Sequence, residues 1–71
     1  MDQRTIYVRL LDEGTDVWRP VEAVAVSPDV FEIAPDVTVP DDERWEFGPG
    51  ERVCCRTSDD GLLIATSTPA S

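Results

Sequence analysis

The chain has 71 residues, of which 41% are hydrophobic, and its 15 acidic and 6 basic residues give a formal net charge of −9 at pH 7. A chain of this length buries only about 60% of the surface that its unfolded form exposes, so it has room for one small core. The negative charge argues against direct contact with nucleic acid or with anionic membranes, because both bind basic patches.

The sequence predicts neither membrane insertion nor export. Its apolar runs are far shorter than the roughly 20 residues that span a bilayer. The N-terminus lacks the basic and apolar segments of a secretory signal. A cytoplasmic location is therefore expected.

The first predicted strand covers residues 5–11, where Ile6, Val8 and Leu10 alternate with other residues and should share one face. Turn-forming residues at 12–16, including Gly14, lead into a second strand over residues 17–26. Pro20 lacks an N–H for the strand ladder, which predicts an edge position or a bend near the start of this second strand.

A turn at residues 27–29 precedes a short third strand over residues 30–34. Residues 35–50 are irregular, and within the segment 40–47 the pattern fits either a single helical turn that begins near Pro40 or a short extra strand around Trp45. Pro49-Gly50 predicts a type II turn before a fourth strand over residues 51–57. Asp59-Asp60-Gly61 predicts a tight hairpin into a last strand over residues 62–66.

Five short strands, tight turns and one long loop predict an all-β fold. The order of these elements favours a small five-stranded SH3-like barrel, made of an antiparallel meander plus a C-terminal hairpin. An OB-like arrangement is less favoured, because it usually needs a longer chain and a helix. We expect a single domain over residues 4–67 and a flexible C-terminal tail over residues 68–71.

Two stretches carry a resemblance to known proteins: LLDEGTDVWRPVEA at residues 10–23 and WEFGPGERVCC at residues 45–55, the second followed by LLIA at residues 62–65. Together they resemble a group of short, uncharacterised bacterial proteins that share the pattern DEGTxVWRPVEA followed by WxFxPGxxV. The resemblance covers roughly residues 6–66. It implies an SH3-like barrel, and it implies no particular activity.

The aromatic residues of these two stretches have two interpretations. In SH3-like barrels, aromatic residues and a proline near the long loops can line a shallow groove for a peptide. In the structural interpretation, both tryptophans fill the small core, Pro20 sets a bend, and Arg19 stacks on an indole or pairs with a loop carboxylate. The candidate binding residues are Trp18, Arg19, Pro20, Trp45 and Phe47.

Acidic residues concentrate in the predicted turns. Charged turns are usually no more than solvated surface. The functional alternative is a surface whose carboxylates imitate a row of phosphates and occupy a basic, nucleic-acid-binding protein. The candidate residues for such a surface are Asp12, Glu13, Asp16, Asp41, Asp42 and Glu43.

Cys54 and Cys55 are neighbours on a predicted strand, so they should point to opposite faces, and a disulfide between them would be strained. We expect two free thiols, one of them facing the core. The chain has no histidine and no second cysteine pair, so it lacks the usual set of zinc ligands, and neither a metal nor a cofactor is expected. Without histidine there is also no ordinary Ser-His or Cys-His dyad, and an enzyme is not expected.

The favoured hypothesis is a small, non-enzymatic, SH3-like module that binds a protein or peptide. The alternative from another class is an acidic decoy or inhibitor of a basic protein. A third possibility is a structural subunit that forms a homo-oligomer, because a small core gains stability from association.

Overall fold

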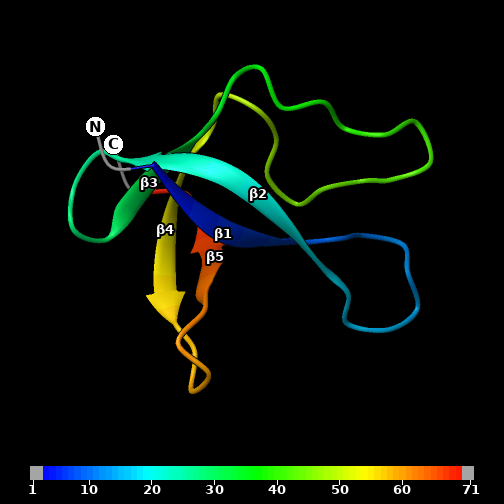
Figure 1. Cartoon of the computed structure of the whole chain (residues 1–71). Coiled ribbons are helices and arrows are strands. Elements are labelled where there is room, and N and C mark those ends of the chain that lie inside the picture. Colours follow the sequence, from blue (N-terminus) through cyan, green and yellow to red (C-terminus); the bar gives the residue numbers. More distant parts are fainter. Residues whose placement is uncertain (1–2, 70–71) are drawn as a thin grey trace.

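The computed structural model describes residues 3–69, in which five strands form a closed barrel and no helix is present (Figure 1). The strands are β1 (Gln3–Arg9), β2 (Trp18–Ala25), β3 (Val30–Ile33), β4 (Arg52–Thr57) and β5 (Leu63–Ser67). Every predicted strand is present and begins and ends within two residues of its predicted limits. The predicted all-β, SH3-like barrel is confirmed, whereas residues 70 and 71 of the predicted tail lie outside the described part of the chain.

The barrel closes where its first and last strands meet. From β1 to β5, each strand is antiparallel to the strand before it. The fifth strand of such a meander runs in the same direction as the first, so β5 can pair with β1 only in parallel. This pairing is short, with Ile6 opposite Leu63 and Tyr7 opposite Ile64.

Beyond β5, the same edge of β1 is covered by the long connection between β3 and β4. Trp45 of this connection forms an antiparallel bridge with Leu10, and the Leu11 N–H donates to the Arg44 carbonyl at 2.7 Å. Figure 1 shows this connection as a wide loop that leaves the barrel and returns to it. The loop therefore completes the closure that β5 begins.

The two conformations predicted for residues 40–47 are each present in part. The Glu43 N–H donates to the Pro40 carbonyl at 3.0 Å, which closes a single turn. Trp45, two residues later, makes the strand-like bridge to β1. The segment is thus a turn followed by a bridge, and neither a helix nor a full sixth strand forms.

The core lies between the inward faces of all five strands. Ile6 and Val8 are fully buried and Leu10 is nearly so, as their alternation predicts. On the outward face of β2 Val24 is half-buried, whereas Val26 just beyond the strand is exposed, so this strand is covered on its second face only in part. The buried cluster consists of Ile6, Val8, Val21, Ala23, Phe31, Ile33, Phe47, Val53 and Ala65.

Two predicted glycine turns have the backbone conformations that they require. Gly50 has a φ of 81°, and the Glu51 N–H donates to the Gly48 carbonyl at 3.2 Å, which is the geometry of a type II turn. Gly61 has a φ of 84° in the β4–β5 hairpin, where its N–H donates to the Ser58 carbonyl at 2.9 Å. Both positions favour glycine because a side chain strains this left-handed conformation.

Pro20 lies within β2, opposite Tyr7 of β1. The Leu10 N–H donates to the Val17 carbonyl, which shows that the backbone groups of Val17 face β1. Because these groups alternate in direction along the strand, the backbone nitrogen of Pro20, three residues later, faces away from β1. On that side β3 pairs with β2 only from Ala23 onward. The missing N–H of Pro20 therefore falls on an edge stretch of the strand, as predicted.

A β-bulge lies beside the two cysteines. Cys54 lies opposite Ser67 and Cys55 opposite Ala65, so Thr66 is an extra residue on β5. The Thr66 hydroxyl donates to the Cys54 carbonyl at 3.2 Å. Cys55 packs against the core cluster, which Cys54 does not join, and both are free thiols as expected.

Ile33 offers a direct test of the interior. Because this side chain is fully buried in a small core, Ile33→Val should lower the free energy of unfolding by about 1 kcal/mol. Val26→Ala, at an exposed position, should lower it by less than about 0.5 kcal/mol. Urea unfolding followed by circular dichroism measures both changes, and equal losses would contradict the assignment of Ile33 to the core.

Candidate functional site

The five residues predicted to bind a partner do not form one surface. Successive side chains of β2 point to opposite faces, so Trp18 and Pro20 face outward and Arg19 faces the inner side. Trp45 lies on the long loop, half-buried against the core. Phe47 is only 8% exposed and belongs to the core itself, where a partner does not reach it.

Trp18 is the one exposed aromatic side chain within residues 3–69, with 40% of its surface accessible. It borders a shallow hollow of about 360 Å³ on the outer face of the barrel. Ile64 of β5 and Arg56 of β4 contribute to the walls of this hollow, and they lie opposite each other in the sheet. The complete lining is Trp18, Arg56, Ser58, Asp59, Ile64 and Thr66.

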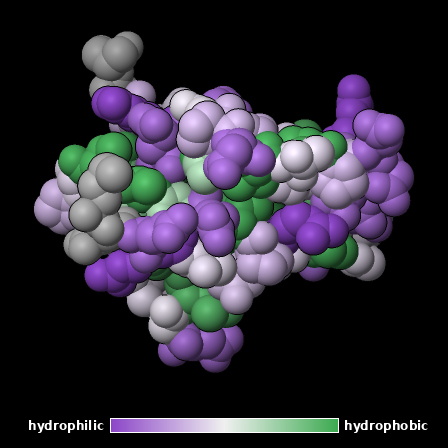
Figure 2. All heavy atoms as spheres, turned by 45° about the horizontal axis from the view of Figure 1, so that its top comes forward, coloured by the Kyte–Doolittle hydropathy of each residue, from purple (hydrophilic) through white to green (hydrophobic). Residues whose placement is uncertain are grey.

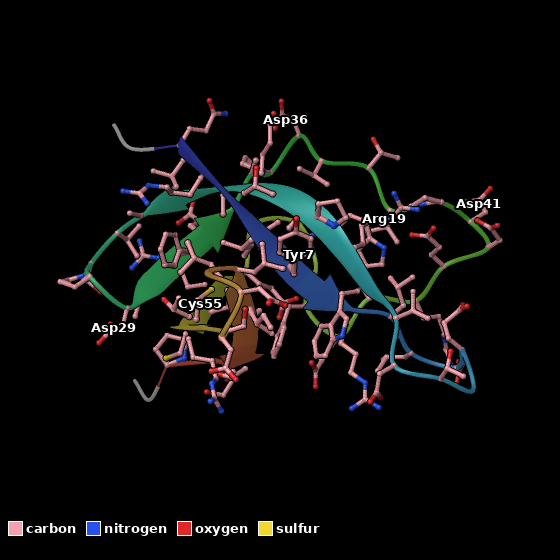
Figure 3. All side chains as sticks on the ribbon, turned by 60° about the horizontal axis from the view of Figure 1, so that its bottom comes forward. Tyr7, Arg19, Asp29, Asp36, Asp41 and Cys55 are labelled. Carbon is pink, nitrogen blue, oxygen red and sulfur yellow. The ribbon has the colours of Figure 1, made fainter. Side chains whose placement is uncertain are left out.

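The outer face next to the hollow continues across β1. Tyr7, half-buried, lies between Pro20 of β2 and Ile64 of β5 in the sheet register. Figure 3 shows Tyr7 over the outer side of β1, near the middle of the barrel. Arg9 lies directly opposite Trp18 and forms an ion pair with Asp16 at 2.9 Å. The exposed indole therefore stands at one end of a mixed aromatic and aliphatic strip.

Arg19, Glu43 and Trp45 form a separate network at the end of the barrel. The Arg19 guanidinium donates from Nε to Glu43 Oε1 at 2.7 Å and from Nη2 to Glu43 Oε2. The Trp45 indole N–H donates to the same Oε1 at 2.9 Å. A bidentate arginine pair with a third donor is a strong arrangement for a carboxylate whose side chain is only 14% exposed.

This network joins the long loop to β2, and in Figure 3 Arg19 lies on the side of the barrel that faces this loop. The prediction that Arg19 pairs with a loop carboxylate is confirmed, and the partner is Glu43. The tryptophan packed against the core at this end of the barrel is Trp45. Trp18, which the structural interpretation also placed in the core, is exposed.

The hydrogen bonds from Arg19, followed by that from Trp45, lower the pKa of Glu43 below its ordinary value of 4.5. A carboxyl whose folded pKa is depressed stabilises the fold above its unfolded pKa, and this contribution is lost as the pH falls through the folded pKa. The ion pair with Glu43 correspondingly raises the pKa of Arg19, which stays charged throughout. Protonation of Glu43 at acid pH should therefore weaken the attachment of the long loop to β2.

Glu43→Gln should reduce stability at pH 7, and the difference from the wild type should shrink as the pH falls below 4.5. Urea unfolding at a series of pH values measures this difference. Glu46→Gln, at an exposed position of the same loop, is the matched control and should have a smaller effect at pH 7. Parallel stability curves for Glu43→Gln and the wild type across this pH range would refute the role of Glu43.

The acidic candidates are divided between paired and unpaired groups. Besides Glu43, two of them form exposed ion pairs: Asp12 with Arg44 at 3.1 Å and Asp16 with Arg9 at 2.9 Å. The two loops that carry all six candidates project from the same side of the barrel in Figure 1. Among residues 3–69, the candidates without an ion pair are Glu13, Asp41 and Asp42.

Other carboxylates point elsewhere. Figure 3 places Asp29 at the opposite end of the molecule from Asp41. Asp59 lines the Trp18 hollow in the β4–β5 hairpin. In the view of Figure 2, hydrophobic residues appear as separate patches among hydrophilic ones. The acidic surface is therefore distributed over the molecule, with one concentration at the two joined loops.

The described residues contain no cluster of three or more side chains that would hold a metal ion. Within residues 3–69 there is also no helix with the length and apolar character of a membrane span. Burial, followed by the neighbouring charge of Cys54, raises the pKa of the Cys55 thiol from 9.0 to about 11. Cys55 is therefore a poor nucleophile at neutral pH, because the thiolate is the reactive form.

Cys55 should react slowly with an alkylating reagent. A pKa higher by two units lowers the thiolate fraction about 100-fold, and the greater intrinsic nucleophilicity of the thiolate restores about tenfold of this loss. In Cys54→Ser the contribution of Cys54 is removed and that of burial remains, so iodoacetamide at pH 8 should react with Cys55 more slowly in the folded chain than in guanidinium, by up to about tenfold. Equal rates in the two states would show that the thiol is not protected.

Five residues of the Trp18 hollow were not among the sequence candidates: Arg56, Ser58, Asp59, Ile64 and Thr66. They come from β4, β5 and the turn between them, far from Trp18 in the sequence, and only the closure of the barrel brings them beside it. Side chains alternate along β5, so Ile64 points outward where its neighbour Ala65 points into the core. This alternation was the feature of the sequence that could have predicted an outward apolar side chain.

No family model, curated protein or solved structure matches the chain. The resemblance of residues 6–66 to short bacterial proteins therefore stays a prediction.

Proposed function

We propose that the protein is a small, non-enzymatic module that binds a segment of a partner protein on the outer face of the barrel, at Trp18. The observation that supports this proposal is the exposed indole at the border of a hollow. Exposed tryptophans are frequent anchors of protein interfaces, because the ring provides a large contact area with few rotatable bonds. The adjoining strip of Tyr7, Pro20 and Ile64 extends this contact area across three strands.

The arrangement supports binding better than catalysis. The hollow is shallow, and its titratable groups are one arginine and one aspartate that form no ion pair within residues 3–69. A general acid-base mechanism needs groups whose pKa is tuned and which are held in position by other side chains. Glu43, which has a lowered pKa, is instead held by Arg19 and Trp45 and attaches the loop.

The acidic-decoy hypothesis receives less support from this geometry. A decoy that imitates nucleic-acid phosphates needs unpaired carboxylates on one face. Arginines of the same chain engage Asp12, Asp16 and Glu43, which are half of the candidate set. Within residues 3–69, Glu13, Asp41 and Asp42 are the members of the candidate set that remain without an ion pair. The hypothesis of a self-associating subunit has no comparable structural argument.

Site-specific cross-linking tests the proposed function. A photo-reactive phenylalanine analogue at position 56, on the wall of the hollow, should capture a partner in cells that express the protein. The same analogue at position 38, an exposed threonine of the long loop outside the hollow, is the control and should not capture this partner.

Trp18→Ala in the position-56 variant should reduce the cross-linked product about tenfold, because an aromatic anchor is lost. The fold should be retained, since the indole is exposed, and circular dichroism checks this. Equal capture at positions 38 and 56, or capture that does not depend on Trp18, would refute the proposal.

A further inference from the structure

We infer that the segment bound at Trp18 is basic, and that an arginine or lysine of the partner lies on the Trp18 indole beside Asp59. This inference rests on the proposed function, because it names the chemistry of the partner at the same hollow. The charges around the hollow and the net charge of the whole chain support it.

The long-range field favours a cationic partner. The formal net charge of −9 on a chain of 71 residues attracts basic segments and repels acidic ones before any contact is made. Within residues 3–69, four of the six arginines are already held in ion pairs with carboxylates of the chain. The remaining acidic excess therefore dominates at a distance.

The contact surface also suits a cation. The face of an exposed indole attracts guanidinium and ammonium groups through its quadrupole. Asp59 lines the same hollow, Asp60 follows it in the same hairpin turn, and neither forms an ion pair within residues 3–69. Asp16 of the β1–β2 loop is balanced by its ion pair with Arg9, which lies opposite Trp18. The unpaired negative charge beside the exposed tryptophan therefore comes from the β4–β5 turn.

Arg56 is the one group of the hollow that opposes this assignment. Arg56 lines the same hollow as Asp59 and has no ion pair within the described residues. An acidic partner would meet Arg56, but it would also meet Asp59 and the field of the whole chain. Arg56 should therefore weaken the binding of a basic segment, and its removal should strengthen that binding.

The experiment uses the full chain labelled with ¹⁵N and three short peptides: an alternating Arg-Gly peptide, its Glu-Gly counterpart and its Gln-Gly counterpart. Trp18→Phe identifies the indole signal of Trp18, so binding at the hollow is followed directly by NMR. We expect the Arg-Gly peptide to shift the Trp18 indole signal, with an affinity that falls as salt is added. The Glu-Gly peptide should give no shift.

Charge variants decide whether the effect is local. Asp59→Asn should weaken binding of the Arg-Gly peptide about threefold, and Arg56→Gln should strengthen it by a similar factor. Asp29→Asn changes the net charge by the same amount as Asp59→Asn but lies in the β2–β3 turn, at the far end of β2 from Trp18. It should therefore weaken binding clearly less than Asp59→Asn.

The outcomes separate this inference from the proposed function. Equal weakening by Asp59→Asn and Asp29→Asn, weakening by Arg56→Gln, or no binding of the Arg-Gly peptide at Trp18 would overturn the inference. The inference is also refuted if the Gln-Gly or Glu-Gly peptide shifts the Trp18 signal as strongly as the Arg-Gly peptide. In each of these cases, cross-linking at position 56 that still depends on Trp18 means that the proposed function stands and that only the basic character of the partner is refuted.

Discussion

The pairing of one edge of β1 with two different partners is the constraint on which this structure depends. β5 pairs with the first part of that edge in parallel, and the bridge between Leu10 and Trp45 covers the part beyond it. Without the bridge between Leu10 and Trp45, the barrel would remain open along β1 beyond its pairing with β5, and the core beneath would be exposed. Because so short a chain has little core to spare, the few hydrogen bonds that close this edge matter more than they would in a larger domain.

The Arg19, Glu43 and Trp45 network supports the same closure. Trp45 supplies apolar contact with the core, and its indole N–H shares the Glu43 carboxylate with Arg19. A single carboxylate therefore connects β2 to the loop that completes the barrel. The network accounts for two of the five residues that the sequence pattern suggested for partner binding, and it assigns them to the architecture.

The outer face is what remains for function. Trp18 is left outside because its neighbour in the sequence, Arg19, takes the inner side, and the alternation of β2 allows only one of them to do so. Closure then brings β4 and β5 close enough for Arg56 and Ile64 to form a hollow with the indole. The same geometric event thus buries one tryptophan in part and gives the other a binding surface. The acidic β4–β5 turn beside Trp18 adds a charge preference to this surface, and the net charge of the chain acts in the same direction because it repels acidic partners.

Local sequence patterns were enough to predict the strands, the glycine turns and the inward faces, because alternation and turn conformation depend on residues that are close together in the chain. Ile6, Val8 and Gly50 are examples, and all three are found as their local pattern predicts. Three features could be read only from the folded chain: which tryptophan is exposed, which carboxylate binds Arg19, and which residues lie beside Trp18. Each of these depends on contacts between segments far apart in the sequence, such as β2 with the long loop and β2 with β5. The pattern of neighbouring residues does not show which distant segments will meet. The closure of the barrel determines these contacts.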